Sequence, residues 1–199
     1  PRHGSAVAAL VADAAMTLGG RTLVLTTTLR AIAVIAQVLR QQLAQRGSHL
    51  DVLAQGEWPK LRLMERFRAG AGRQGGCIRV GSASCWEGFD VPGDARQLVG
   101  IDKLPFPPPG DPLVEARTLQ IEQSGGSAFK EYALAEAAVA LKQGAGRLIR
   151  HESDRGVLVV CDSRLVRMGY GKRLIAALPP LRLLSGAEEF DAALEDLAT

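Results

Sequence analysis

Short apolar runs alternate along the chain with longer segments in which apolar residues recur every three or four positions. The short runs are rich in valine, leucine and isoleucine and are bounded by glycine or polar residues, which favours strands. Five strands are predicted, at residues 21–26, 50–53, 77–80, 97–101 and 157–160. The longer segments have the period of amphipathic helices. Helices are predicted at residues 5–18, 29–46, 58–68, 113–123, 127–150, 168–178 and 187–197.

This alternation predicts an α/β fold in which helices cover both faces of a parallel sheet. In such folds ligands bind where loops leave the carboxyl ends of the strands. We expect one domain over residues 1–180. Residues 181–199, after Pro179 and Pro180, are expected to form a C-terminal tail with a helix.

Composition narrows the class of protein. Hydrophobic residues make up 47% of the 199 residues and the formal net charge is only +3, which is too mild to indicate nucleic-acid binding by itself. The sequence has no apolar run near the roughly 18 residues of a membrane span and no signal peptide. Cys77, Cys85 and Cys161 are widely spaced and fit a reducing, cytoplasmic setting without a metal site. The chain begins at Pro1, so we interpret it as a fragment.

The loop after the third predicted strand, residues 81–93, mixes glycines and small residues with two acids. Glycines allow a backbone to approach a ligand closely, and the acids could accept hydrogen bonds from sugar hydroxyls or orient cations. The alternative is a surface loop whose glycines only make turns. Residues 83–86 also echo a papain-like protease signature, but the chain contains no asparagine and His151 is too close in sequence, so we reject a protease.

Gln143, Arg147 and Arg150 have the spacing i, i+4, i+7, so they share one stripe if the helix continues to Arg150. Two guanidiniums and an amide suit a polyphosphate, because the arginine fork matches phosphate oxygens in pairs. The alternative is a solvated basic helix end, which the helix macrodipole also favours. The pattern predicts a nucleotide phosphate site.

Neighbouring residues support this interpretation of the helix. Leu141 and Leu148 fall on roughly the opposite side, where they can face the core, and Gly146 leaves space beside the first arginine. The sequence has neither a Gly-rich phosphate-binding loop ending in Gly-Lys-Ser/Thr nor an Asp-Glu-Ala-His-like metal-binding box. The residues alone therefore predict a polyphosphate contact without the loop and the box that would hold the phosphates and a metal ion.

Several segments resemble, in order, motifs of the DinG branch of superfamily 2 helicases, whose eukaryotic relative is the XPD helicase. They are residues 23–28 (LVLTTT, fourth motif), 84–93 (SCWEGFDVPG, fifth), 103–106 with 111–112 (KLPF and DP, between the fifth and sixth), 143–150 (QGAGRLIR, sixth), 154–156 (DRG) and 162–164 (DSR). The resemblance runs from about residue 20 to residue 179. The chain departs from the family at Cys85, where phenylalanine is usual, and in the fourth motif, where threonines replace an aromatic residue and a serine.

The resemblance implies a RecA-like fold, the second motor domain of an ATP-dependent DNA helicase. It implies that Arg147 and Arg150 are arginine fingers, and that Gln143 positions them or the attacking water. The implied ATP-binding residues are Glu87, Gly88, Asp90 and Gly146. The implied DNA-binding residues are Thr26, Thr27, Thr28 and Ser84.

The resemblance also implies cofactors and partners. ATP and Mg²⁺ would be shared with a missing N-terminal RecA-like domain, and single-stranded DNA would be the substrate, in repair or replication with 5′ to 3′ movement. Many family members have a 4Fe–4S cluster, which would lie in the missing part. The isolated chain is expected to be inactive. A stand-alone, non-catalytic module that binds nucleic acid or a protein remains the alternative, because the chain lacks a phosphate loop.

Overall fold

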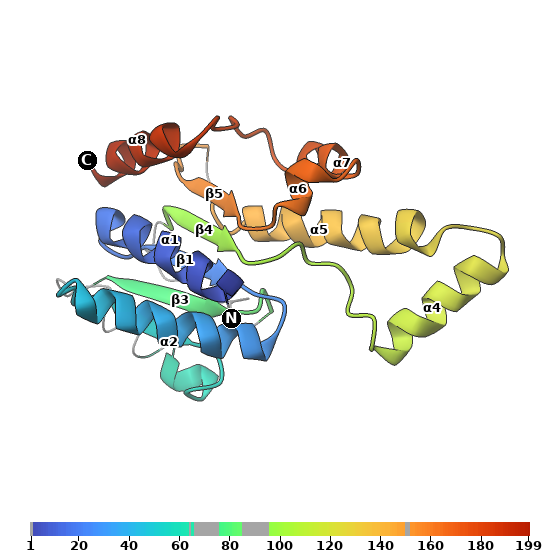
Figure 1. Cartoon of the computed structure of the whole chain (residues 1–199), viewed down its shortest axis with the longest axis horizontal. Helices are drawn as coiled ribbons and strands as arrows, with labels where there is room; N and C mark the ends of the chain where they lie inside the picture. The colour runs from blue at the N-terminus through green and yellow to red at the C-terminus, as the bar shows by residue number, and fades with distance from the viewer. Residues whose placement is uncertain (1, 64, 66–75, 85–95, 150–151) are drawn as a thin grey trace.

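The computed structural model describes residues 2–63, 65, 76–84, 96–149 and 152–199 (Figure 1). Its centre is a five-stranded sheet in the order β2-β3-β1-β4-β5, and every paired neighbour is parallel. The strands are β1 (Thr22–Leu25), β2 (Asp51–Ala54), β3 (Cys77–Gly81), β4 (Leu98–Ile101) and β5 (Val157–Val160). The predicted α/β fold with a parallel sheet is thus confirmed, and each strand lies within a residue or so of its predicted position.

Helices surround this sheet. They are α1 (Arg2–Leu18), α2 (Leu29–Gln45), α4 (Pro112–Gln123), the π-helical segment η1 (Phe129–Ala133), α5 (Leu134–Ala145), α6 (Arg164–Arg167), α7 (Gly171–Ala177) and α8 (Ala187–Ala198). Residues 60–63 and 65 are also helical, and the rest of the helix predicted at 58–68 lies partly outside the described residues. The helix α1 ends at Gly19 and Gly20, whose positive φ angles of 65° and 94° suit residues without a Cβ.

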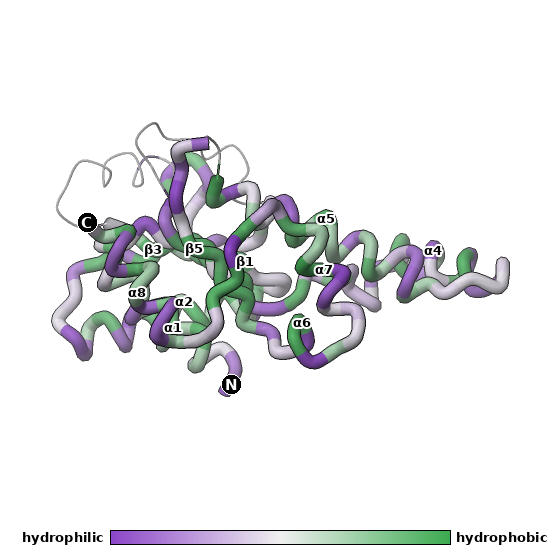
Figure 2. The backbone as a smooth tube through the Cα atoms, turned by 90° about the horizontal axis from the view of Figure 1, so that it is seen from above, coloured by the Kyte–Doolittle hydropathy of each residue, from purple (hydrophilic) through white to green (hydrophobic). Residues whose placement is uncertain are grey.

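Side chains alternate between the two faces of the sheet, as the strand period requires. Val24 and Val80 face α1 and α2, where they join a core with Val11 and Ile35. Leu23, Leu25, Val99 and Ile101 face the opposite side, where α5 and α7 supply Leu141 and Leu174. Helices therefore cover both faces of the sheet, which explains why β1 and β4 are largely apolar and buried along their whole length (Figure 2).

The tail helix α8 covers the first half of β5 beside α1. Leu194 is buried in a small core with Leu18 of α1, Leu98 of β4 and Val157 of β5. The tail is thus packed against the domain, and the predicted boundary at residue 180 stays a prediction.

The helix α4 projects from the body of the molecule, and the start of the helical run formed by η1 and α5 lies next to it (Figures 1 and 2). Asp111 caps its start by accepting hydrogen bonds from Leu113 and Val114, and Pro112 follows at the first helical position. The helix contains no buried residue. It is stabilised locally by its cap rather than by the core.

Candidate functional site

The arginine loop, residues 146–149, lies at the amino edge of the sheet. The helix α5 ends over the last residues of β1 and β4, where a Cβ on Gly144 would meet Leu25 and Ile101, and the loop then runs back to the starts of β4 and β5 (Figure 1). The carbonyl of Arg147 accepts a hydrogen bond from Nη1 of Arg96, at 3.5 Å, just before β4. Leu148 is buried, and a Cβ on Gly156, just before β5, would stand 2.4 Å from its Cδ1. These contacts place the loop at the start of two strands.

The predicted helix to residue 150 is wrong in its last part, because α5 ends at Ala145. The amide of Arg147 bonds to the carbonyl of Gly144, and that of Leu148 bonds to Ala145, a tighter pattern than the α-helix has. Glycines at 144 and 146 weaken the helix at this point. Arg147 is therefore half-buried in a turn beyond the helix.

The other residues of the predicted stripe, and the residues predicted to support it, lie in different settings. Gln143 is exposed in the last turn of α5, on the helix itself, and Arg150 lies outside the described residues. Leu141 and Leu148, predicted to face the core, are both buried in one cluster. Gly146 is exposed, and a Cβ there would meet only the carbonyls of Lys142 and Gln143, at 3.4 Å.

The fifth-motif residues are only partly described. Glu87, Gly88 and Asp90 lie outside the described residues. Ser84 is exposed, and its hydroxyl lies 3.2 Å from that of Ser82. These serines follow β3 and therefore lie at the carboxyl edge, opposite the arginine loop.

The three threonines that follow β1 also lie at the carboxyl edge, in three different settings. Thr26 is buried, and its hydroxyl donates to the carbonyl of Thr28 at 3.3 Å. The hydroxyl of Thr28 caps α2 by accepting from the amide of Ala31 at 3.1 Å. Thr27 is exposed. Two of the three hydroxyls thus have structural partners, whereas Thr27 faces solvent.

An aromatic cluster lies near the same edge and was not predicted from the sequence. Phe106 lies 5.7 Å from Phe129 and 5.8 Å from Tyr170, between ring centroids, and Phe129 lies 5.3 Å from Tyr170. The guanidinium of Arg164 lies 5.5 Å above the Phe106 ring. The three rings come from distant segments, so no local pattern could have shown them together. Exposed cations flank the cluster on these segments: Lys103, Lys130 and Arg167.

Asp162 fixes the position of Arg164. Its carboxylate accepts hydrogen bonds from the Arg164 side chain, the shortest at 2.6 Å, and from the amide of Leu104 at 3.0 Å. Burial alone would raise the pKa of Asp162. The hydrogen bonds from the Arg164 side chain and from the backbone amides of Leu104 and Arg164 outweigh burial and lower the pKa to about 2. The carboxylate is therefore ionised at neutral pH, and the arginine is held over Phe106.

A cavity of about 490 Å³ opens beside this pair. It is lined by His3, Lys103, Cys161, Asp162, Ser163 and Arg164. Burial and the charge of Asp102 raise the pKa of the Cys161 thiol to about 11, so the thiol is protonated and unreactive at neutral pH. The cavity thus presents cationic and hydroxyl groups rather than a nucleophile.

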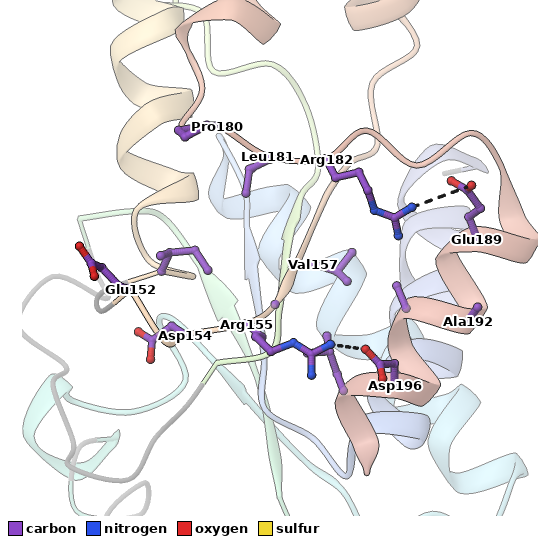
Figure 3. A pocket seen from close by; sticks show the side chains of 14 residues that line it. Glu152, Asp154, Arg155, Val157, Pro180, Leu181, Arg182, Glu189, Ala192 and Asp196 are labelled. Atoms are coloured by element: carbon purple, nitrogen blue, oxygen red, sulfur yellow. Dashed lines mark hydrogen bonds and ion pairs between the residues drawn. The ribbon is translucent and has the colours of Figure 1, made fainter.

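A larger groove of about 560 Å³ lies between residues 152–157, residues 180–182 and α8 (Figure 3). Two ion pairs bridge it, Arg155 with Asp196 and Arg182 with Glu189. Its four carboxylates outnumber its two guanidiniums, since Glu152 and Asp154 also line it. The described lining of the groove therefore carries more negative than positive charge, which disfavours phosphate, and it adjoins the arginine loop through Ile149.

The described part of the chain offers neither a metal site nor a membrane span. There, histidine, cysteine and acidic side chains form no group of three or more placed to hold a metal ion. Among the same residues, no helix has the length and hydrophobicity needed to span a membrane.

Comparison with known proteins agrees with this arrangement. Residues 11–181 match the family described as helicase C-terminal domain. The chain is 42% identical over 160 residues to the ATP-dependent DNA helicase YoaA of Haemophilus influenzae, covering 80% of this chain and 24% of that protein. It is 40% identical over 188 residues to the ATP-dependent helicase DinG of Mycobacterium tuberculosis, covering 94% of this chain and 27% of that protein.

A third relative is named for a different activity. The chain is 33% identical over 177 residues to the 3′-5′ exonuclease DinG of Bacillus subtilis, covering 88% of this chain and 18% of that protein. The chain thus spans about a quarter or less of the length of these relatives. Because the family match covers most of its length, the chain belongs to the helicase C-terminal domain family, as a DinG-like member.

Proposed function

We propose that this chain is the second RecA-like motor domain of a DinG-type ATP-dependent DNA helicase. The observation that supports the proposal is the separation of two surfaces on one sheet. The arginine loop with Arg147 lies at the amino edge, and the aromatic and cationic residues around Phe106 lie at the carboxyl edge. A motor needs both a nucleotide contact and a nucleic-acid contact, and a rigid sheet connects them here.

The amino edge fits half of an ATP site. Arg147 is half-buried, and the neighbouring Gln143 and Gly146 are exposed, so a second domain can approach this edge. Arg147, with Arg150, would contact the γ-phosphate as an arginine finger, and Gln143 would orient them or the attacking water. Glu87, Gly88 and Asp90 are proposed to line the same cleft. ATP and Mg²⁺ supply the phosphoryl-transfer chemistry, held by an N-terminal RecA-like domain that this chain does not contain.

The carboxyl edge fits a single-stranded DNA track. Thr27 and Ser84 are exposed there and could donate to phosphates, whereas Thr26 and Thr28 would act by shaping the turn. Phe129 is 45% exposed and offers a ring on which a base could stack, an interaction worth about 1–3 kcal/mol per base. Lys103 and Arg167 add the positive charge that backbone binding needs.

The strand β4 connects the two surfaces directly. Arg96, which bonds to the arginine loop, lies two residues before it, and Asp102 and Lys103 follow its end. The four residues of β4 between them are all buried, and a packed strand moves as a rigid unit. We infer that a shift of the arginine loop on hydrolysis reaches the DNA track through β4.

The resemblance supports further proposals about the complete protein. A role in DNA repair or replication, a cytoplasmic location, 5′ to 3′ movement and a 4Fe–4S cluster in the missing part are proposed on that ground. The alternative of a stand-alone, non-catalytic module is not favoured. The similar proteins are named as enzymes, and each is about four times as long as the matched segment or longer.

Two variants of the complete protein test the proposal, because one should change the rate of ATP turnover and the other the affinity for DNA. We expect Arg147→Ala to lower DNA-stimulated ATP turnover at least about 100-fold, since an arginine finger contributes about 10³–10⁵. Its affinity for single-stranded DNA should stay within about twofold, because the two edges are separate. Phe129→Ala should raise the DNA concentration for half-maximal stimulation about tenfold, with the maximal rate nearly unchanged. Normal turnover by Arg147→Ala would refute the proposed nucleotide site.

A further inference from the structure

Asp102 is a buried carboxylate in the middle of the carboxyl edge. Its residue is only 1% exposed, and its amide donates to the carbonyl of Leu25 at 3.0 Å. Because β1 and β5 flank β4, Asp102 lies between the threonine turn and the segment that contains Asp162. A carboxylate in such a place must be compensated by a donor, because transfer from water is costly.

His3, in the first turn of α1, supplies that donor from 99 residues away. Its Nε2 lies 2.7 Å from Oδ1 of Asp102 and 3.0 Å from the Asp102 carbonyl oxygen. The Nε2–H tautomer satisfies both acceptors with one ring. The histidine side chain is 42% exposed and also lines the cavity with Lys103 and Arg164. The Nε2 edge of the ring thus binds the carboxylate, while the rest of the ring borders solvent.

The loop that follows β4, residues 102–106, is fixed at several points by these contacts. His3 holds its first residue, Asp102, through the side chain and the carbonyl. Asp162 accepts the amide of Leu104, and Arg164 lies over the ring of Phe106. The remaining charged residue, Lys103, is exposed between these anchors. The contact between His3 and Asp102 is thus one of the anchors of the loop that carries Lys103 and Phe106.

We propose that His3 is a positioning residue of the DNA track: it holds Asp102 and thereby sets the loop that presents Lys103 and Phe106 to the strand. The inference rests on the proposed DNA-binding function. Without the imidazole, the Asp102 carboxylate loses its donor and turns or takes up water. The loop then loosens, and an uncompensated negative charge remains near the phosphates.

The test uses the complete protein and a fluorescent oligothymidine. We expect His3→Ala to weaken binding about fivefold, which corresponds to about 1 kcal/mol, because the contact acts on the DNA only through the loop. The maximal ATPase rate at saturating DNA should stay within about twofold, because the arginine loop lies at the other edge. His3→Gln, whose amide can donate in place of Nε2, should recover most of the affinity. The matched control is His49→Ala at an exposed histidine, which should bind as the unmodified protein does.

A double variant separates positioning from general damage. Asp102→Asn in the His3→Ala background removes the uncompensated charge, so its affinity should exceed that of His3→Ala alone. Wild-type affinity in His3→Ala would overturn the inference, and so would a His3→Gln variant as weak as His3→Ala. If Phe129→Ala weakens DNA binding while His3→Ala does not, the inference fails and the proposed function stands. If the unmodified protein binds no single-stranded DNA, the proposed function itself fails.

Discussion

Gly144 of α5 packs against Leu25 of β1 so closely that a Cβ on the glycine would stand 3.2 Å from Leu25 Cδ1. The same atom would stand 3.3 Å from Cδ1 of Ile101 in β4. The glycine thus lets the last turn of α5 lie directly on the sheet. Because Arg147 follows three residues later, this contact helps to set where the arginine loop lies against the sheet.

Gly144→Val is expected to destabilise the chain by about 1–3 kcal/mol, because extra carbons in a packed core force side chains or backbone to shift. Urea unfolding followed by circular dichroism measures the change. In the complete protein the same variant should also slow ATP turnover, since the arginine loop must move with the helix end.

Gly146→Ala is the matched control for Gly144→Val. Its φ of −64° suits alanine, and the added Cβ would meet only carbonyl oxygens at 3.4 Å. We expect its free energy of unfolding to stay unchanged or to rise by up to about 1 kcal/mol, from helix propensity. A Gly146→Ala variant as unstable as Gly144→Val would contradict the assignment of the contact to Gly144.

Thr28→Ala is expected to lower the free energy of unfolding by about 1 kcal/mol, because it removes the hydroxyl that caps α2. Thr28→Ser keeps an oxygen in place and should restore most of the loss. Thr27→Ala at the adjacent exposed position should leave stability within about 0.5 kcal/mol. Equal losses for Thr27→Ala and Thr28→Ala in thermal unfolding would show that the cap is not what stabilises this turn.

The sequence contained the information for the sheet and for most of the helices. Runs such as residues 98–101 are apolar and fully buried, as strands covered on both faces are, so the number of strands and their parallel arrangement could be predicted. The predicted end of α5 is five residues too late. The apolar period of the sequence continues through Gly144 and Gly146, while the backbone there changes to tighter turns. A local pattern gives the period of a helix more reliably than its last residue.

The candidate site could be predicted only where its residues are close in sequence. The arginine pattern spans eight positions and can be read from the sequence, and the predicted burial of Leu141 and Leu148 is confirmed, whereas the role of the arginines stays a prediction. The contact of His3 with Asp102 and the cluster of Phe106, Phe129 and Tyr170 join segments that the sheet topology brings together. No spacing rule relates such residues, so they emerge only from the fold.

The lowered pKa of Asp162 predicts a specific loss of stability in acid. An aspartate with a pKa of about 2 in the folded chain, against about 3.9 when unfolded, stabilises the fold fully above pH 4 to 5. As pH falls through 2 this contribution, about 2 kcal/mol by linkage, disappears. Asp162→Asn should therefore be less stable than the unmodified chain at pH 6, with the difference shrinking towards pH 2. A difference that stays constant from pH 6 to pH 2 would argue against an ionised Asp162 held by Arg164.

The isolated 199-residue chain is expected to release no phosphate from ATP above background. Its described residues place arginine and amide groups at the amino edge but no phosphate-binding loop, and the groove beside them is dominated by carboxylates. A guanidinium alone stabilises charge that develops on a phosphate already held and aligned by other groups, so the rate gain requires the second domain.

The measurement is phosphate release with and without oligothymidine, on protein shown by circular dichroism to be folded. The control is Arg147→Ala, since a contaminating ATPase would be indifferent to it. Turnover that this substitution abolishes would mean that the chain contains a complete site, and the two-domain proposal would then have to be abandoned.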